Sequence, residues 1–300
     1  MSALSARLAL VSQTSKVTIS ELTVVAAALD KQLSRDLAQH WDVMASCHAF
    51  PTAEDVPLGY WPIFIRNDVD PDAAGVHDDD DGQPFALVNS VRNWTLIASH
   101  EALEMVVDPS GNRFIVGDSP ETPPRRVEFL VEVCDPCETF GYSVNGVTVS
   151  DFYTPHYFSP NSGSGGPYSF QGNIKQPRQV LPGGYLSWHD PARGEWKQLL
   201  NVGGTETIVT LPGIQRAMES FRSQVDRKSN AATAGSLRAA GRQLEKVVLP
   251  VARHQDACDR KAAMWHEKIK EFSRSSSARR GAKTRKPAAR GGRKKSRPET

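Results

Sequence analysis

A histidine and two glutamates in the segment NWTLIASHEALEMVVDP have the types and the spacing of a metal site. His100 and Glu104 are four residues apart, so on a helix they project from nearly the same face, one turn apart. An imidazole nitrogen and a carboxylate oxygen placed in this way can bind one divalent ion. Glu101 is rotated by about 100° from His100, where its carboxylate can accept a proton from a metal-bound water molecule. The pattern therefore predicts half of a metal-dependent hydrolytic site.

The residues around these three side chains are mostly apolar, among them Leu96, Ile97, Leu103 and Met105. A helix this hydrophobic is mostly buried, and buried carboxylates need partners. Taken alone, HEALE also fits a solvent-exposed helix with charged residues on its face. The apolar flanks favour the metal site, because two glutamates and a histidine destabilise a buried helix unless a cation is present.

The composition is that of an ordinary globular chain, with 39% hydrophobic and 23% charged residues among 300. No stretch approaches the roughly 20 apolar residues that a membrane span needs. The first residues lack the long apolar core of a secretory signal, and four cysteines do not suggest a disulfide framework. We therefore expect a cytoplasmic protein without a membrane span.

Hydrophobic periodicity predicts the elements that position the motif. A short strand at residues 16–19 precedes a helix that is capped by Ser20 and ends near Trp41, and YWPIFIRND forms a strand. The segment AAGVHDDDDGQPFALVNS predicts two strands around an acidic turn. We interpret the aspartates beside His77 as a solvated turn, because they lack the spacing of a calcium loop. Residues 93–107 form the motif helix.

Further elements follow the motif helix. A third helix is expected at residues 127–133, and YSVNGVTVSDF predicts a hairpin with a type I′ turn at Asn145-Gly146. A loop rich in Gly, Pro and Ser covers residues 159–184, at the surface or as a lid. TETIVTL is a further strand, and residues 212–272 are expected to be mostly helical.

The order of these elements resembles that of zincin metallopeptidases of the gluzincin type. In that family an edge strand beside the metal binds the extended substrate, and a later helix supplies a glutamate ligand. The segment VEFLVEVCDPCE resembles the later helix, which implies Glu132 as the third ligand besides His100 and Glu104. Asp135 would then orient His100 through its other ring nitrogen. Glu104 stands where the family has a second histidine, and the linker to Glu132 is longer than the shortest in the family.

The same resemblance implies one Zn²⁺ per chain and a peptide or protein as substrate. With two carboxylate ligands, another divalent metal such as Mn²⁺ is also compatible. The chain is similar as well to uncharacterised bacterial and phage proteins with an SHExLEM…DP…EVxDP pattern. That likeness covers roughly residues 16–190.

Other residues compete for a place in the site. Glu128 precedes Glu132 by four residues and would share its helix face, so the sequence leaves the third ligand open between them, with Glu138 a weaker candidate. Cys134 and Cys137 form a lone CxxC, which we interpret as packing beside the metal helix rather than redox chemistry.

A donor for a developing oxyanion is a further requirement of amide hydrolysis. His156 in FYTPHYFSP is the predicted candidate, with Tyr153 and Tyr157 beside it. The alternative is a turn whose aromatic residues pack on the core. Tyr185, after two glycines, is a similar candidate.

The charge is divided unevenly along the chain. Eleven of the 36 Lys and Arg residues and one of the 34 Asp and Glu residues lie in residues 274–300, so this tail carries +10 and the rest of the chain −8. The tail has too few apolar residues to order itself. We expect it to bind nucleic acid or another polyanion by counterion release, or to act as a solubilising extension.

Together these features predict an α+β protein. A flexible leader (1–15) would precede a zincin-like metal-binding domain (16–210) with a small mixed sheet, followed by a C-terminal helical segment (211–273) and a disordered basic tail (274–300). The predicted function is peptidase-like hydrolysis by a metal-activated water, with Glu101 as general base. The alternative is a non-catalytic metal-binding scaffold, phage-related or DNA-associated, that uses its tail.

Overall fold

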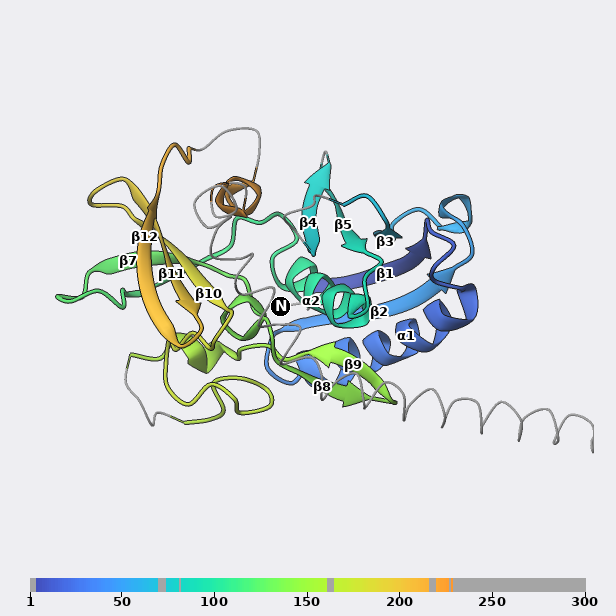
Figure 1. Cartoon of the computed structure of the whole chain (residues 1–300), viewed down its shortest axis with the longest axis horizontal. Coiled ribbons are helices and arrows are strands. Elements are labelled where there is room, and N and C mark those ends of the chain that lie inside the picture. Colours follow the sequence, from blue (N-terminus) through green and yellow to red (C-terminus); the bar gives the residue numbers. More distant parts are fainter. Residues whose placement is uncertain are drawn as a thin grey trace, which may run out of the picture. The chain divides into compact units, whose positions relative to one another are not determined.

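Five strands form a mixed sheet in the order β2-β1-β3-β5-β4 in the computed structural model, which describes residues 4–69, 74–80, 82–160, 165–215, 220–226 and 228. Strands β1, β2, β3 and β5 run parallel, and β4 is antiparallel to β5 at the edge (Figure 1). Their bounds are Leu4–Ser12 (β1), Val43–Phe50 (β2), Trp61–Arg66 (β3), Gly75–Asp80 (β4) and Gln83–Asn89 (β5).

The first strand lies inside this sheet, between β2 and β3, so the prediction of a loose leader at 1–15 is wrong. The run from Leu8 to Val11 is buried, and a continuous apolar run is typical of a parallel strand covered on both faces. The strand expected at residues 16–19 is also wrong. Thr18 instead caps the first helix, since its hydroxyl accepts the backbone N–H of Glu21 at 3.3 Å.

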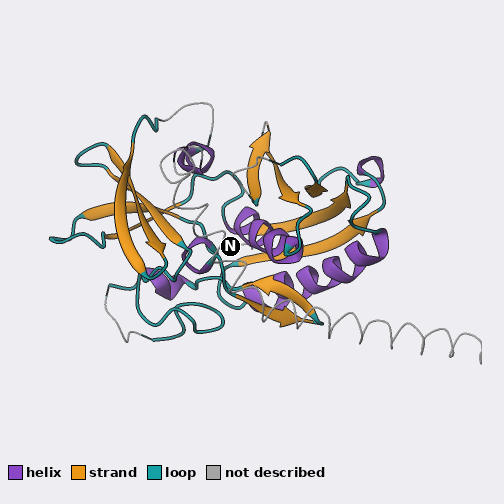
Figure 2. Ribbon diagram, viewed as in Figure 1, coloured by secondary structure: helices purple, strands orange, loops and turns teal. Residues whose placement is uncertain are grey.

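Two helices position the predicted motif. Helix α1 (Ile19–Lys31) continues as a π-helical turn, η1 (Gln32–Leu37), close to the predicted span. Helix α2 (Trp94–Val107) is the predicted motif helix. Both helices pack against the sheet and against each other, and α2 also contacts the strand β9. The described chain after α2 is mostly strand and loop (Figure 2).

A second, antiparallel sheet has the order β12-β11-β10-β7-β6. The helix predicted at 127–133 is wrong, because strand β7 occupies this segment and buries Val127 and Phe129 with period two. The strand predicted in TETIVTL is confirmed as β12. The bounds are Phe114–Asp118 (β6), Arg126–Leu130 (β7), Tyr185–Asp190 (β10), Glu195–Val202 (β11) and Thr205–Leu211 (β12).

A hairpin of β8 (Gly141–Val144) and β9 (Val147–Ser150) covers the helices. Its turn residues Asn145 and Gly146 have φ values of 51° and 87°, which confirms the predicted type I′ turn. Short 3₁₀ turns complete the description: η2 (Ala53–Asp55), η3 (Asp135–Cys137) and η4 (Pro155–Phe158).

Residues 220–226 continue this compact unit beyond the domain boundary predicted at 210. Residues 221–226 are helical, and Phe221 stacks on Trp196 of β11 with ring centroids 5.2 Å apart. The other residues of the predicted C-terminal helical segment, and the whole basic tail, lie outside the described residues. Among the described helices, none is long and apolar enough to cross a membrane.

Candidate metal centre

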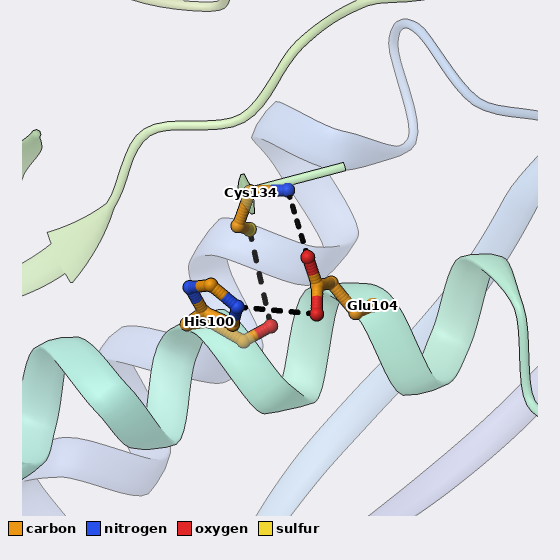
Figure 3. Close-up of side chains that lie close together, drawn as sticks. All are labelled: His100, Glu104 and Cys134. Atoms are coloured by element: carbon orange, nitrogen blue, oxygen red, sulfur yellow. Dashed lines mark hydrogen bonds and ion pairs between the residues drawn. The ribbon is translucent and has the colours of Figure 1, made fainter. Parts of the chain in front are cut away.

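Helix α2 brings the three predicted residues together in the interior. His100 is 8% exposed, Glu101 3% and Glu104 0%. The Nε2 atom of His100 lies 3.1 Å from the Oε2 atom of Glu104, one helical turn away (Figure 3). The i, i+4 spacing in the sequence therefore places an imidazole and a carboxylate side by side, as predicted.

The two oxygens of Glu104 have different surroundings. Oε1 accepts the backbone N–H of Cys134 at 3.0 Å, which fixes the carboxylate (Figure 3). Oε2 faces three cationic or potentially cationic groups: His100 Nε2, Arg222 Nη1 at 2.6 Å and His77 Nδ1 at 3.8 Å. This oxygen is therefore the point at which the side chains of the site meet.

Glu132, the predicted third ligand, follows β7 and reaches the same place. Its Oε2 atom contacts Arg222 Nη1, and its Oε1 atom is buried without a hydrogen-bond partner among the described residues. Glu128 lies on β7 itself and pairs with His189 at 3.0 Å. Because Glu128 and Glu132 belong to a strand and the loop after it, the helix face that would have joined them does not form.

His77 is a member of the site that the sequence prediction missed. It lies on the edge strand β4 and is 2% exposed. The strand includes Asp78 to Asp80, so the interpretation of these aspartates as a solvated turn is wrong. The Nδ1 atom of His77 lies 3.2 Å from Glu101 Oε2, which favours the tautomer with the proton on Nδ1 and directs the lone pair of Nε2 to Arg222. Pairing of GVHDDD with QPFALVN and the period of two, which turns His77 inward, are the signals that could have found it.

Close packing between β4 and α2 makes the contact of His77 with Glu101 possible. Gly75 opens the strand beside the motif helix, and a Cβ atom there would lie 2.6 Å from Glu101 Oε1 and from a methyl group of Ile97. A larger residue at position 75 would push the edge strand away from the helix.

Arg222 lies at the centre of the site. Its side chain is 3% exposed, and its Nη1 atom contacts Glu104, Glu132 and, at 3.0 Å, His77 Nε2. Its Nη2 atom lies 3.6 Å from Glu101 Oε2. We call the following five residues the central cluster: His77, Glu101, Glu104, Glu132 and Arg222. The sequence prediction missed Arg222, because nothing near it in the chain distinguishes it from other arginines of a helical segment.

The electrostatics of the site follow from burial and from its crowded charges. Burial alone would lower the pKa of His100, but the carboxylates of Glu104 and Asp135 outweigh it and hold the pKa well above its ordinary value. Burial opposes ionisation of Glu104, but the charges of His100 and Arg222 hold the pKa of Glu104 well below its ordinary value. In the metal-free protein, His100 is therefore protonated and Glu104 is ionised.

The other two acids behave in the opposite way. Burial raises the pKa of Glu132 well above its usual range; Arg222 opposes this, and the charge of Glu104 adds to it. Burial and the charge of Glu104 likewise raise the pKa of Asp135. The Oδ1 atom of Asp135 lies 3.3 Å from His100 Nε2, the nitrogen that also faces Glu104, and not at the other ring nitrogen as the resemblance implied.

Two groups of donor atoms in the described part of the chain could hold a metal ion, each with all atoms within 4.8 Å of one another. The first donor group is His77, Glu104 and Glu132, and the second is His100, Glu104 and Cys134. The predicted trio is thus divided between the two, with Glu104 shared.

The first donor group fits a divalent cation better than the second. The contact of His77 Nδ1 with Glu101 leaves Nε2 as the ligand nitrogen, and the buried Oε1 atom of Glu132 offers a further acceptor. In the second group, burial and the charge of Glu104 raise the pKa of the Cys134 thiol well above its ordinary value, which opposes the thiolate that a metal needs. Cys137 is likewise a buried free thiol, in line with a packing role for both cysteines.

The predicted oxyanion donor His156 is exposed and lies on the turn η4, where its ring faces Gly166. No contact of His156 with the central cluster occurs in the described structure. Tyr153, by contrast, is buried, and its hydroxyl has no hydrogen-bond partner among the described residues. Burial raises the pKa of Tyr153 well above its ordinary value, and Tyr157, Glu132 and Glu104 add to the effect.

Comparison with protein-family models, with curated proteins and with solved structures gives no match for this chain. A proposal of the function therefore rests on the geometry of the site.

Proposed function

We propose that the chain is a metal-dependent hydrolase of peptide or amide bonds, with one divalent cation, Zn²⁺ in the first place, bound by His77, Glu104 and Glu132. The observation that carries this proposal is the convergence of these three buried donors, from an edge strand, a helix and a loop, within 4.8 Å. Buried carboxylates need a compensating cation, and three donors this close together suit a divalent ion.

The arrangement of the edge strand supports the zincin-like interpretation. Strand β4 ends the sheet order, runs antiparallel to β5 and adjoins the motif helix at Gly75. An edge strand has free backbone N–H and C=O groups that can pair with an extended peptide. A substrate bound there would lie beside His77, which is on the same strand.

Glu101 has two possible contributions. When bound, the cation would lower the pKa of a water molecule and so supply the nucleophile. The carboxylate of Glu101 would accept the proton from that water as the general base. The same carboxylate accepts the Nδ1–H of His77 and so orients the imidazole. A glutamine at this position keeps the acceptor for His77 and removes the base, so one variant separates the two roles.

The test uses the purified full chain, its metal content and hydrolysis of a mixed peptide library. The wild type is expected to contain about one Zn²⁺ per chain, and Glu104→Ala to lose it. Glu101→Gln is expected to keep the metal and to lose at least about 100-fold in kcat. A Zn²⁺ content of Glu104→Ala equal to that of the wild type would refute the assignment of Glu104 as a ligand. An unchanged kcat of Glu101→Gln would refute the role of Glu101 as general base.

One observation favours a second candidate, a non-catalytic scaffold that holds no metal ion, in contrast to the metal-binding scaffold expected from the sequence. Arg222 already supplies a positive charge to Glu104 and Glu132, so the cluster is compensated without a metal ion. Under this alternative, protein purified from metal-supplemented medium would contain no divalent metal, and added Zn²⁺ would not change its thermal stability.

A further inference from the structure

Arg222 and a metal ion compete for one position. The Nη1 atom of Arg222 contacts Glu104, Glu132 and His77, which are the three residues of the first donor group. Because these donor atoms all lie within 4.8 Å of one another, there is no room among them for both a guanidinium nitrogen and a metal ion. The position holds one cation or the other.

The donors suit a metal ion better than they suit the guanidinium. Nη1 carries two hydrogens, so it can donate to only two of its three neighbours at a time. A divalent ion accepts lone pairs from two carboxylates and one imidazole together. The Oε1 atom of Glu132, which is buried without a partner among the described residues, adds a further unused acceptor.

Side chains outside the central cluster hold the segment that carries Arg222 in place at the edge of the site. Ser223 donates its hydroxyl to Asp78 Oδ2 at 2.6 Å, and Ser220 donates to Asp78 Oδ1 at 3.3 Å. Asp78 follows His77 on the edge strand β4. The segment is thus attached to the strand that we propose as the substrate-binding edge.

Two backbone N–H groups of the same segment donate hydrogen bonds to the loop after α2, one to a carbonyl and one to a side chain. The N–H of Arg222 donates to the carbonyl of Gly111 at 3.1 Å, and the N–H of Phe221 donates to Asn112 Oδ1 at 3.0 Å. Phe221 also stacks on Trp196 of β11, and Val225 is buried in the same apolar cluster. The segment therefore stays anchored to the second sheet, while its contacts with a surface loop and the edge strand belong to elements that open at low free energy.

We propose that residues 220–226 form a latch that closes the metal centre, in which Arg222 substitutes for the divalent cation until the ion displaces it. The inference rests on the proposed metal centre and adds its regulation. Binding of the ion expels the guanidinium, releases the segment from Asp78 and uncovers the edge strand. Metal loading and opening of the site are then one event.

The first test compares metal affinities of the metal-stripped full chain, titrated with Zn²⁺ and separately with Mn²⁺. Arg222→Met removes the charge and keeps much of the length, and Arg193→Met, at a half-exposed arginine 3.9 Å from Glu195, is the matched control. We expect Arg222→Met to bind at least tenfold more tightly than the wild type, and Arg193→Met to bind equally. Ser223→Ala, which weakens the attachment to Asp78 only, is expected to bind several-fold more tightly.

The outcomes separate the latch from the proposed function. If the wild type binds the ion and Arg222→Met binds no more tightly, the latch is refuted and the metal centre stands. If neither binds, the metal centre itself is refuted, and the latch with it.

A second measurement needs no variant, in case Arg222→Met does not fold. Hydrogen exchange of the wild type is followed with and without saturating Zn²⁺. The amides of Phe221 and Arg222 are expected to lose protection on metal binding, while those of α1 keep theirs. Retained protection at both amides in the metal-bound protein would overturn the latch.

Discussion

The Nδ1 atom of His77 lies 3.2 Å from the carboxylate of Glu101, which joins the edge strand of the first sheet to the motif helix. This contact couples the two halves of the candidate site. The carboxylate that follows the histidine of the HExxE motif holds a second imidazole in a fixed tautomer. The acid predicted as general base therefore also has a structural task, and the edge strand brings a second histidine into the candidate site.

Replacing His77 should weaken metal binding more than replacing His100. We expect His77→Ala to lose at least about tenfold in Zn²⁺ affinity in a chelator-competition assay, because a ligand is removed. His100→Ala is expected to lose less, since His100 is held protonated by Glu104 and Asp135. His48→Ala, at an exposed histidine of β2, is the control. If His100→Ala lost more Zn²⁺ affinity than His77→Ala, the ligands would be His100, Glu104 and Glu132, as predicted from the sequence.

The parts of the site that the sequence predicts are those with local periodicity. His100, Glu101 and Glu104 share one helix, so a spacing of four residues is enough to bring them together. The resemblance implies Glu132, and its side chain lies in the central cluster although the expected helix is a strand followed by a loop.

The remaining parts depend on contacts that are distant in the chain. His77 pairs with Glu101 across 24 residues, and Arg222 reaches Glu104 across 118. Neither contact can be read from the spacing of its two residues in the sequence. The acidic run after His77 also hid the alternation of β4, because polar side chains of an edge strand resemble those of a turn. The first strand was missed because a doubly buried strand has no alternation of apolar and polar residues.

The motif helix is held by a buried polar network that can be tested through stability. Gln32 donates to the carbonyl of Ser150 at 2.9 Å and accepts the hydroxyl of Ser99 at 2.7 Å. Gln32→Leu leaves the buried Ser99 hydroxyl without its acceptor and the Ser150 carbonyl without this donor, although Ser99 Oγ still accepts the N–H of Ser150 at 2.9 Å. We therefore expect a loss of about 1–3 kcal/mol in the free energy of unfolding. Urea denaturation measures it, with the exposed Gln13→Leu as control, expected within about 0.5 kcal/mol of the wild type. A loss below about 1 kcal/mol for Gln32→Leu would show that the network does not hold the helix.

The stability of the chain should depend on pH through Glu138. Burial raises the pKa of this carboxyl to about 7, above its value of about 4.3 in an unfolded chain. Between these values the folded state binds more protons than the unfolded state, so this contribution to stability is lost as the pH rises from about 4.5 to 7. Glu138→Gln should therefore gain stability relative to the wild type across this window, by up to about 3–4 kcal/mol at pH 8, at about 1.4 kcal/mol per pKa unit.

Urea denaturation of both proteins at pH 5, 6, 7 and 8 checks this dependence on Glu138. The exposed Glu54→Gln is the control and should show a constant difference from the wild type. A difference between Glu138→Gln and the wild type that does not change with pH would contradict the prediction.

Tyr153 and Tyr157 allow a matched comparison, because they stack with ring centroids 4.5 Å apart and differ in their hydroxyl groups. The hydroxyl of Tyr157 donates to the carbonyl of Gln179 at 3.2 Å, whereas that of Tyr153 is buried without a partner among the described residues. Tyr157→Phe should lose about 1 kcal/mol of stability, and Tyr153→Phe should lose none or gain.

If the hydroxyl of Tyr153 binds a substrate oxygen, the same Tyr153→Phe variant loses kcat while keeping its fold and its metal. Equal losses of stability in the two variants would show that the hydroxyl of Tyr153 serves the fold, and would exclude it as a donor kept for substrate.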